Sequence, residues 1–266
     1  MIASGNILKM KSTLGEVVEY KLPIGDELLL MNQFLEKKIR LEFTGEINCI
    51  HSGKKIKKSY GQGFSYESFM KLAACDMCII KPELCHFDKG TCREPEWGKK
   101  NCFAPHVIYL SDTSSIKVGI TRKSQVPTRW IDQGATRAIP LIEVDNRMIS
   151  GQVEVELKSM FNDKTNWRNM LKGLSSDVDL EEQKEIVFEE FAELFDDMGA
   201  EEIEESVIDI NYPVVEYPTK ITSLGFDKNS KIEGTLLGIK GQYLIFDSGV
   251  INLRKHQGYK INISVN

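Results

Sequence analysis

The sequence predicts an α+β protein, and three observations lead to that class. Both ends of the chain alternate in the manner of strands, the centre mixes strand patterns with helical patterns, and a cysteine-rich segment separates the start from the centre. At 266 residues the chain is long enough for one large domain or two small ones. We expect five regions: a β-rich N-terminal region (1–60), a Cys-rich zinc-binding segment (61–105), a mixed core (106–175), an acidic helix (176–210) and a β-rich C-terminal region (211–266).

The β-rich ends are predicted from periodicity. Residues 7–10 and 17–22 flank a turn at 13–16, which indicates a hairpin. Residues 38–43 alternate polar and apolar side chains, which is typical of a half-buried strand. Four more strands are predicted near the C-terminus, at 234–239, 242–246, 250–253 and 260–265. We expect a small sheet or half-barrel there that shares strands with the N-terminal region.

The mixed core has the predicted order strand, strand, helix, strand, helix. Its first two strands, 106–110 and 116–121, are joined by a polar turn. Pro127 suits the first turn of a short helix, and Gly134 suits its end.

The second half of the core follows at once. A third strand covers 138–144, and Pro140 within it favours an edge position, since proline cannot donate to a ladder. Asp145 or Asn146 caps the next helix. The apolar residues of that helix recur at helical spacing: Ile149, Val153, Leu157 and Met160.

Charge is distributed unevenly along the chain. Residues 177–205 contain 14 Asp and Glu residues and one Lys, so their net charge is −13. Because the whole chain has a net charge of −5, the remaining residues have a net charge of +8. The pattern at 180–198 predicts a helix with one apolar face that docks on the core despite its charge. A basic body is compatible with a polyanionic partner such as nucleic acid, because binding follows the local field. A solvated acidic helix with no further role is the plainer interpretation.

No membrane segment is predicted. The N-terminus lacks a basic stretch followed by an apolar run, and no apolar run approaches the roughly 18 residues that span a bilayer. A cytoplasmic protein is therefore expected, and oligomeric state is left open.

Five cysteines lie within 28 residues, and they predict a structural Zn²⁺ site. They are Cys75, Cys78, Cys85, Cys92 and Cys102. A tetrahedral site takes four ligands, so one cysteine is surplus, or His86 enters instead. Reduced, buried cysteines without a metal are the alternative.

A second group of four residues has the spacing of a zinc ribbon, but three of its four side chains are serines rather than cysteines. Cys49 is followed by Ser52, Ser65 and Ser68 at positions where ligands would be expected. Because a serine hydroxyl stays protonated at neutral pH, it is a poor zinc ligand. We predict no metal there and a buried Cys49 thiol.

Several motifs resemble a bacterial family known only as domain of unknown function 2797. They are LCHF at 84–87, GTCREPEW at 90–97, KVGITR at 117–122, PTRWIDQGA at 127–135, DKTNWRNML at 163–171 and GTLLGIKGQYLIF at 234–246. The resemblance covers most of the chain. Other members carry a C-x2-C…C-x2-C ribbon at the position of the Cys49 group of four residues. The family name implies no activity.

Residues 106–167 resemble, more distantly, the GIY-YIG nuclease superfamily. Ile108-Tyr109 lies at its first motif and Val118-Gly119 at its second, where Lys117 replaces a tyrosine, as in one branch of the superfamily. Arg129 follows at the spacing of its arginine, and Glu154 at the spacing of its metal-binding glutamate.

This resemblance implies metal-dependent cleavage of nucleic acid. Tyr109 would help to activate water, Arg129 would neutralise the phosphate, and Glu154 would hold Mg²⁺ or Mn²⁺. The remaining implied site residue is Gly119. Further contacts to the nucleic-acid backbone are expected from Lys117, Arg122 and Lys123.

Each assignment has a structural alternative. Tyr109 would also suit an ordinary strand aromatic, and Glu154 would also pair with Lys158 one turn away. Helical spacing alone does not choose between Glu154 and Glu156. His106 suits a structural hydrogen bond better than a catalytic base.

The favoured hypothesis is therefore a divalent-metal nuclease with a zinc-stapled insert. The alternative is a non-catalytic, zinc-containing nucleic-acid-binding or adaptor protein, and a third is a scaffold for a small molecule or protein. DNA and RNA are not distinguished by the sequence.

Overall fold

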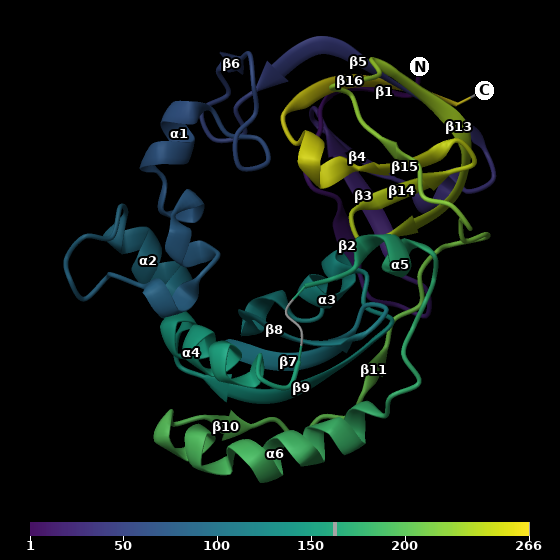
Figure 1. Ribbon diagram of the computed structural model, residues 1–266. Coiled ribbons are helices and arrows are strands. Elements are labelled where there is room, and N and C mark those ends of the chain that lie inside the picture. The colour runs from purple at the N-terminus through teal and green to yellow at the C-terminus, as the bar shows by residue number, and fades with distance from the viewer. Residues whose placement is uncertain (162–163, 266) are drawn as a thin grey trace.

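The computed structural model describes residues 1–161 and 164–265, and it confirms the α+β class. Asp163, the first residue of the 163–171 motif, lies outside the described residues. Three parts surround a central gap between the ribbons in Figure 1: a β-rich body (1–48 and 219–265), an arm (49–105) and a mixed core (106–212). Among the described residues, no helix is both long and apolar enough to cross a membrane.

The β-rich body contains, in the described part of the chain, a sheet of eight strands in which the two ends of the sequence interleave. Strand β5 (Lys38–Asn48) from the N-terminal region lies between β16 (Tyr259–Val265) and β13 (Lys231–Lys240) from the C-terminal region. The remaining strands are β1 (Ala3–Asn6), β12 (Ser223–Leu224), β14 (Tyr243–Phe246), β15 (Gly249–Asn252) and β6 (Lys55–Ile56), which belongs to the start of the arm and pairs with β5. The prediction of shared strands is confirmed.

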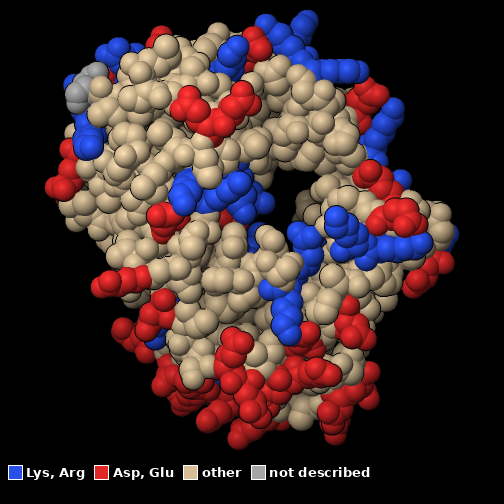
Figure 2. Space-filling model, turned by 180° about the vertical axis from the view of Figure 1, so that it is seen from behind, with Lys and Arg blue, Asp and Glu red and all other residues tan. Residues whose placement is uncertain are grey.

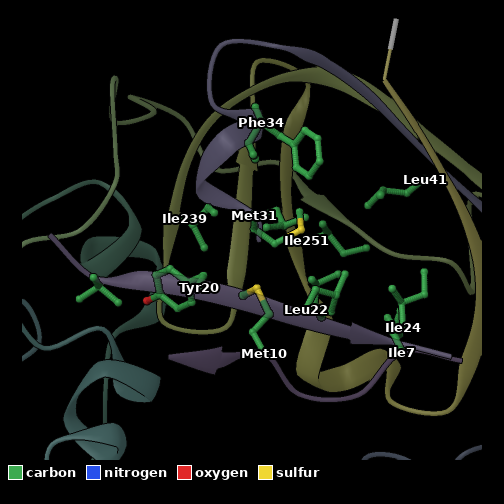
Figure 3. Close-up of a cluster of buried hydrophobic side chains, with 14 of the residues drawn as sticks. Ile7, Met10, Tyr20, Leu22, Ile24, Met31, Phe34, Leu41, Ile239 and Ile251 are labelled. Carbon is green, nitrogen blue, oxygen red and sulfur yellow. The ribbon is translucent and has the colours of Figure 1, made fainter. Parts of the chain in front are cut away.

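A second, three-stranded sheet corrects the predicted N-terminal hairpin. It consists of β2 (Lys11–Thr13), β3 (Glu19–Ile24) and β4 (Glu27–Leu30). Residues 7–10 are not a strand, because Met10 is held by a side chain: Gln242 accepts its N–H at 2.9 Å and donates to its carbonyl at 3.1 Å. Ile7 and Met10 are nevertheless fully buried, and Figure 3 shows them in one cluster with Tyr20, Leu22 and Ile251.

The mixed core contains the predicted order of elements. Strands β7 (His106–Asp112) and β8 (Ile116–Arg122) precede α3 (Thr128–Gln133), β9 (Arg137–Val144) and α4 (Arg147–Leu157). Within the described residues, the sheet order is β10-β9-β7-β8, with β10 (Glu201–Glu202) and β11 (Ile208–Asp209) pairing with opposite ends of β9. Strand β8 is therefore an edge of this sheet.

Two local predictions in the core need correction. Pro140 does not lie on an edge strand, because β9 has β7 on one side and β10 and β11 on the other. Pro140 falls between those two short partners, opposite a register shift in β7, and bulges tolerate proline. Helix α4 ends at Leu157, so Met160 lies in the following turn and is 41% exposed.

Two predictions at helix ends are confirmed. Asn146 caps α4 by accepting the Ile149 N–H at 3.0 Å. Gly134 ends α3 in the left-handed conformation, with φ of 75°.

The helices cover both faces of the core sheet. Helix α4 and the acidic helix α6 (Leu180–Asp197) bury Val153 and Val187 against the face that carries Ile108. Trp130 of α3 packs with Tyr109 on the opposite face, in the same cluster as the β-rich body. The two parts thus share one hydrophobic core.

A short helix also joins the core to the β-rich body. Trp167 of α5 (Trp167–Leu171) stacks on Tyr243 of β14, with ring centres 5.8 Å apart.

The arm runs from β5 to β7 and closes against the core. It contains α1 (Tyr66–Lys71), α2 (Pro95–Cys102) and three 3₁₀ turns between them, at Ala73–Cys75, Met77–Ile79 and Pro82–Leu84. Further 3₁₀ turns occur at Asn32–Phe34, Lys123–Gln125 and Leu253–His256. The turn at Pro82 packs on α4, where a Cβ on Gly151 would lie only 2.6 Å from the Pro82 Cβ. Glycine at 151 therefore allows the close approach of the arm.

Candidate functional site

Three of the four residues expected to be catalytic line one cavity of about 250 Å³ beside the edge strand β8. Gly119 comes from β8, Arg129 from α3 and Glu154 from α4. Lys117 lies on the wall of the same cavity, and Pro82 of the arm forms another part of it. Residues far apart in the sequence thus meet where the sheet edge, two helices and the arm come together.

Tyr109 lies behind the wall of this cavity. It is directly opposite Gly119 in the β7–β8 ladder, and its side chain is fully buried. Its hydroxyl donates to Gln133 Oε1 at 2.9 Å, and the Arg129 guanidinium lies beside it. Burial raises the pKa of Tyr109, although Arg129 opposes this, so the phenol keeps its proton at neutral pH.

Gly119 is explained by this tyrosine. A Cβ at position 119 would lie 2.7 Å from both Cζ and Oη of Tyr109. Since carbon atoms pack at about 3.5–4.0 Å, only glycine leaves room for the ring. The glycine therefore positions the phenol beside Gln133 and Arg129.

The structure distinguishes the two candidate glutamates of α4. Glu154 lines the cavity, and only 14% of its side chain is exposed. Glu156, two residues further on, faces solvent. Glu154 also forms an ion pair with Lys158 at 3.4 Å, which is the structural alternative predicted from the sequence. The same carboxylate therefore both lines the cavity and pairs with Lys158.

The three residues expected to contact a nucleic-acid backbone are separated. Lys117 is 2% exposed, so it faces the cavity rather than the outer surface. Arg122 lines the neighbouring cavity and donates to Asn101 Oδ1 at 2.6 Å. Lys123 is an exposed side chain that pairs with Glu143 at 2.5 Å.

A second cavity of about 340 Å³ adjoins the first and shares Arg129 and Arg147 with it. Lys9 and Arg254 reach it from the β-rich body. We call the two cavities together the basic cleft, since the cations on its described wall outnumber the carboxylates. The cations are Lys9, Lys117, Arg122, Arg129, Arg147 and Arg254, and the carboxylates are Asp132 and Glu154. Figure 2 shows a deep opening bordered by Lys and Arg, while acidic side chains gather elsewhere on that face.

Arg147 is the most informative residue that the sequence did not single out. It is the first residue of α4, and its Nη2 donates to the Ile79 carbonyl of the arm at 2.6 Å. Its pKa is lowered by burial and by the neighbouring Arg129 and Arg122, although cysteine thiols oppose this. Its buried Nε has no hydrogen-bond partner among the described residues. In the sequence, Arg147 directly follows the predicted helix cap Asn146 and precedes Glu154 by seven residues. That position on the same helix as Glu154 was the sequence signal that could have identified it.

Two further lining residues of the cleft were also missed. Lys9 forms an ion pair with Asp132, and Arg254 lies on a 3₁₀ turn of the β-rich body. No local pattern marks either one, because only the packing of the body against the core brings them to the cleft.

The acidic helix does not form the described wall of the basic cleft. Its apolar side docks on the core sheet, and Lys184 Nζ donates to the Ile203 carbonyl at 2.6 Å. The residues that line both cavities come from the body, the arm and the first half of the core. The acidic helix is therefore not positioned as a shield over these cations.

The arm brings four of the five cysteines to one small, enclosed cavity of about 20 Å³, enough for one water-sized group. They are Cys78, Cys85, Cys92 and Cys102. Burial raises the pKa of Cys78 to about 11, and nearby Asp76 and the other three thiols add to the effect. Burial also raises the pKa of Cys75, although the nearby Arg93 opposes this. Four thiols therefore line one small cavity, and Cys75 is not among its lining residues.

Asp76 and His86 lie beside these thiols. In the described residues, the ligand atoms of Asp76, Cys78 and His86 lie within 4.8 Å of one another. The Asp76 carboxylate is already bonded to Arg93 Nε at 2.8 Å, and His86 Nδ1 is bonded to the Thr91 hydroxyl at 2.8 Å. The bond at Nδ1 leaves His86 Nε2 available, 3.4 Å from Asp76 Oδ2, and metal-binding histidines and carboxylates commonly hold such second partners. Asp76 and His86 are therefore candidate ligands together with Cys78.

The serine-substituted group of four residues also comes together. Cys49 is 1% exposed, which confirms that its side chain is buried, and its Sγ lies 3.4 Å from Ser68 Oγ. Burial acts to raise its pKa, but hydrogen bonds from Ser52 and Ser68 outweigh it and lower the pKa to about 5. The serines thus surround the sulfur in place of metal ligands.

His106 occupies a structural position near the cleft. Its Nδ1 is 2.7 Å from the Ala104 carbonyl, and its buried Nε2 has no hydrogen-bond partner in the part of the chain that the structure describes. Burial lowers its pKa to about 4, so the ring is neutral at physiological pH.

Comparison with known proteins supports the wider of the two resemblances. A family model described as "Protein of unknown function (DUF2797)" matches residues 36–261. No curated protein and no solved structure matches the chain. The match includes most of the body, the whole arm and the core, so this chain belongs to the DUF2797 family.

Proposed function

We propose that this protein binds a nucleic-acid backbone in the basic cleft and hydrolyses a phosphodiester there with a divalent cation at Glu154. The observation that carries the proposal is the meeting of Gly119, Arg129 and Glu154 at one cavity. The resemblance to GIY-YIG nucleases requires these residues to converge, although they lie on three separate elements.

The charge of the cleft supports a polyanionic substrate. Six cations and two carboxylates line the two cavities in the described part of the chain, so the local charge opposes the net negative charge of the whole protein. Cations that replace condensed counterions supply much of the affinity for nucleic acid. Arg129 belongs to both cavities, which suits a group that neutralises the phosphate under attack.

Glu154 fits the cation. Its carboxylate is an oxygen ligand of the kind that Mg²⁺ and Mn²⁺ prefer, and it faces a cavity rather than bulk solvent. A bound divalent cation would supply charge stabilisation at the phosphate and a more acidic water. Lys158 pairs with this carboxylate at 3.4 Å.

Tyr109 has a different role from the one implied by the superfamily. Its buried phenol keeps its proton and donates to Gln133, so it is unsuited to take a proton from water. We assign it as a positioning residue that holds Gln133 and Arg129 at the cavity wall.

The four-thiol site would hold structural Zn²⁺. Its residues lie in the arm, and the arm supplies Ile79, Ile80 and Pro82 to the wall of the cleft. A zinc ion bound by Cys78, Cys85, Cys92 and Cys102 would therefore stiffen one wall of the nucleic-acid site.

Non-catalytic binding of nucleic acid by a zinc-containing protein is the second candidate. The buried Tyr109 favours it, because the group implied to activate water has no access to the cavity. The basic cleft supports binding equally in both cases.

The test is a cleavage assay with labelled DNA and RNA in Mg²⁺ or Mn²⁺, with binding followed in parallel by fluorescence anisotropy. The parent is compared with Glu154→Gln and with Glu156→Gln, a matched control on the exposed side of the same helix. The proposal predicts cleavage by the parent and the control, and binding without cleavage by Glu154→Gln. Binding without cleavage by all three supports the second candidate, and equal cleavage by all three contradicts the role of Glu154.

A further inference from the structure

We infer that the strand in the basic cleft is unpaired, so that the substrate class is single-stranded nucleic acid or a single-stranded segment beside a duplex. This inference rests on the proposed function and adds the substrate class. It depends on the direction from which the cations reach the cleft, on its size and on the apolar side chains within it.

The cations converge on a shared space. Lys9 and Arg254 enter the larger cavity from the β-rich body, whereas Arg122, Arg129 and Arg147 enter it from the core. A duplex carries its phosphates on the outside and is met by cations spread over one surface. Cations that face one another across a cavity instead surround one backbone.

The dimensions of the cleft agree with one strand. Its larger cavity measures about 340 Å³, at the lower end of the range of sites that hold small organic ligands, about 300–1,000 Å³, and its smaller cavity, of about 250 Å³, lies below that range. The arm limits the space, because Arg147 is bonded to the Ile79 carbonyl and Gly151 packs against Pro82. The arm thus closes one side, as seen at the opening in Figure 2.

Apolar side chains lie among these cations. Ile79, Ile80 and Ile120 line both cavities, and Ile80 is 76% exposed. Unpaired bases present apolar faces that can contact such side chains, whereas base faces in a duplex are stacked on one another. An exposed isoleucine in a cation-lined cleft therefore favours an unpaired strand.

The test compares binding of a labelled 12-nucleotide single strand and its blunt duplex by fluorescence anisotropy at several salt concentrations, without divalent metal. Arg254→Gln removes a cation of the cleft, and Lys255→Gln on the same 3₁₀ turn is the exposed control. Circular dichroism verifies folding, and Lys9→Gln replaces Arg254→Gln if that variant does not fold.

The inference predicts at least tenfold tighter binding of the single strand than of the duplex by the parent. It also predicts that Arg254→Gln weakens single-strand binding several-fold and reduces the salt slope by about 0.7, the contribution of one phosphate contact. The control should match the parent. Equal or tighter binding of the duplex overturns the inference, as does a salt slope that Arg254→Gln leaves unchanged.

The result is separable from the proposed function. Glu154-dependent cleavage with tighter binding of duplex would overturn the inference and leave hydrolysis intact. Tight single-strand binding without cleavage would overturn hydrolysis and support the inference. No binding of either probe would overturn both.

Discussion

Replacing Gly119 by alanine tests whether the Tyr109 ring occupies the space that the structure gives it. The added Cβ would lie 2.7 Å from both Cζ and Oη of Tyr109 and 3.0 Å from Cε2. The ring has little freedom to withdraw, because it is fully buried, packs edge-on against Trp130 at 5.7 Å and donates to Gln133. The substitution therefore overpacks the junction of the core and the β-rich body.

The expected cost follows from two terms. Overpacking of a well-packed core costs about 1–3 kcal/mol. A displaced ring would also lose its hydrogen bond to Gln133, worth about 1 kcal/mol. We expect Gly119→Ala to lower the free energy of unfolding by about 2–4 kcal/mol, measured by equilibrium unfolding in urea.

Gly15→Ala is the matched control. A Cβ at Gly15 would meet only the Val17 carbonyl, at an ordinary distance of 3.4 Å. We expect the control to lie within about 0.5 kcal/mol of the parent, as exposed substitutions usually do. Adding Tyr109→Phe to Gly119→Ala removes the Oη contact but leaves the Cζ contact, so recovery should be partial. Equal urea midpoints for the two alanine variants would refute the steric argument.

Three further predictions concern the arm and its junction with the core. The parent should bind about one equivalent of zinc, measured by inductively coupled plasma emission spectroscopy, and Cys78→Ser should lose it whereas Cys75→Ser should keep it. Equal loss of zinc in both variants would contradict the four-thiol assignment. His106 has a folded-state pKa of about 4, below the unfolded value of about 6.5, so stability should fall by up to about 3 kcal/mol as pH falls from 6.5 to 4. His106→Asn should flatten that part of the urea-midpoint profile, and an unchanged slope would exclude this histidine as its source. Gly151→Ala should push Pro82 away from α4 and increase limited proteolysis of the arm, and protection equal to that of the parent would show that the contact yields without cost.

Local signals were sufficient for three features of the core. The β7–β8 hairpin, the Asn146 cap and the stop at Gly134 depend on residues close in sequence, and all three are present in the structure. The superfamily spacing favoured Glu154 over Glu156, and the packing of α4 on the sheet and the arm accounts for the different exposure of the two side chains.

Long-range contacts account for the failures of prediction. Met10 is held by Gln242, and the position of Pro140 depends on short strands that lie some 60 residues further along the chain. Arg254 reaches the cleft only because the two ends of the chain form one sheet against the core. Likewise, no spacing rule separates Cys75 from the other four cysteines, since the turns of the arm decide which thiols face one another.

The central claim is that Glu154 holds a divalent cation in the basic cleft. The most direct measurement is a titration of the purified protein with Mn²⁺, in which electron paramagnetic resonance counts the free hydrated ion. The account predicts that the parent and Glu156→Gln each remove one equivalent of Mn²⁺ that Glu154→Gln leaves free in solution. Equal uptake of Mn²⁺ by the parent and Glu154→Gln, or no uptake by any of the three, would contradict it.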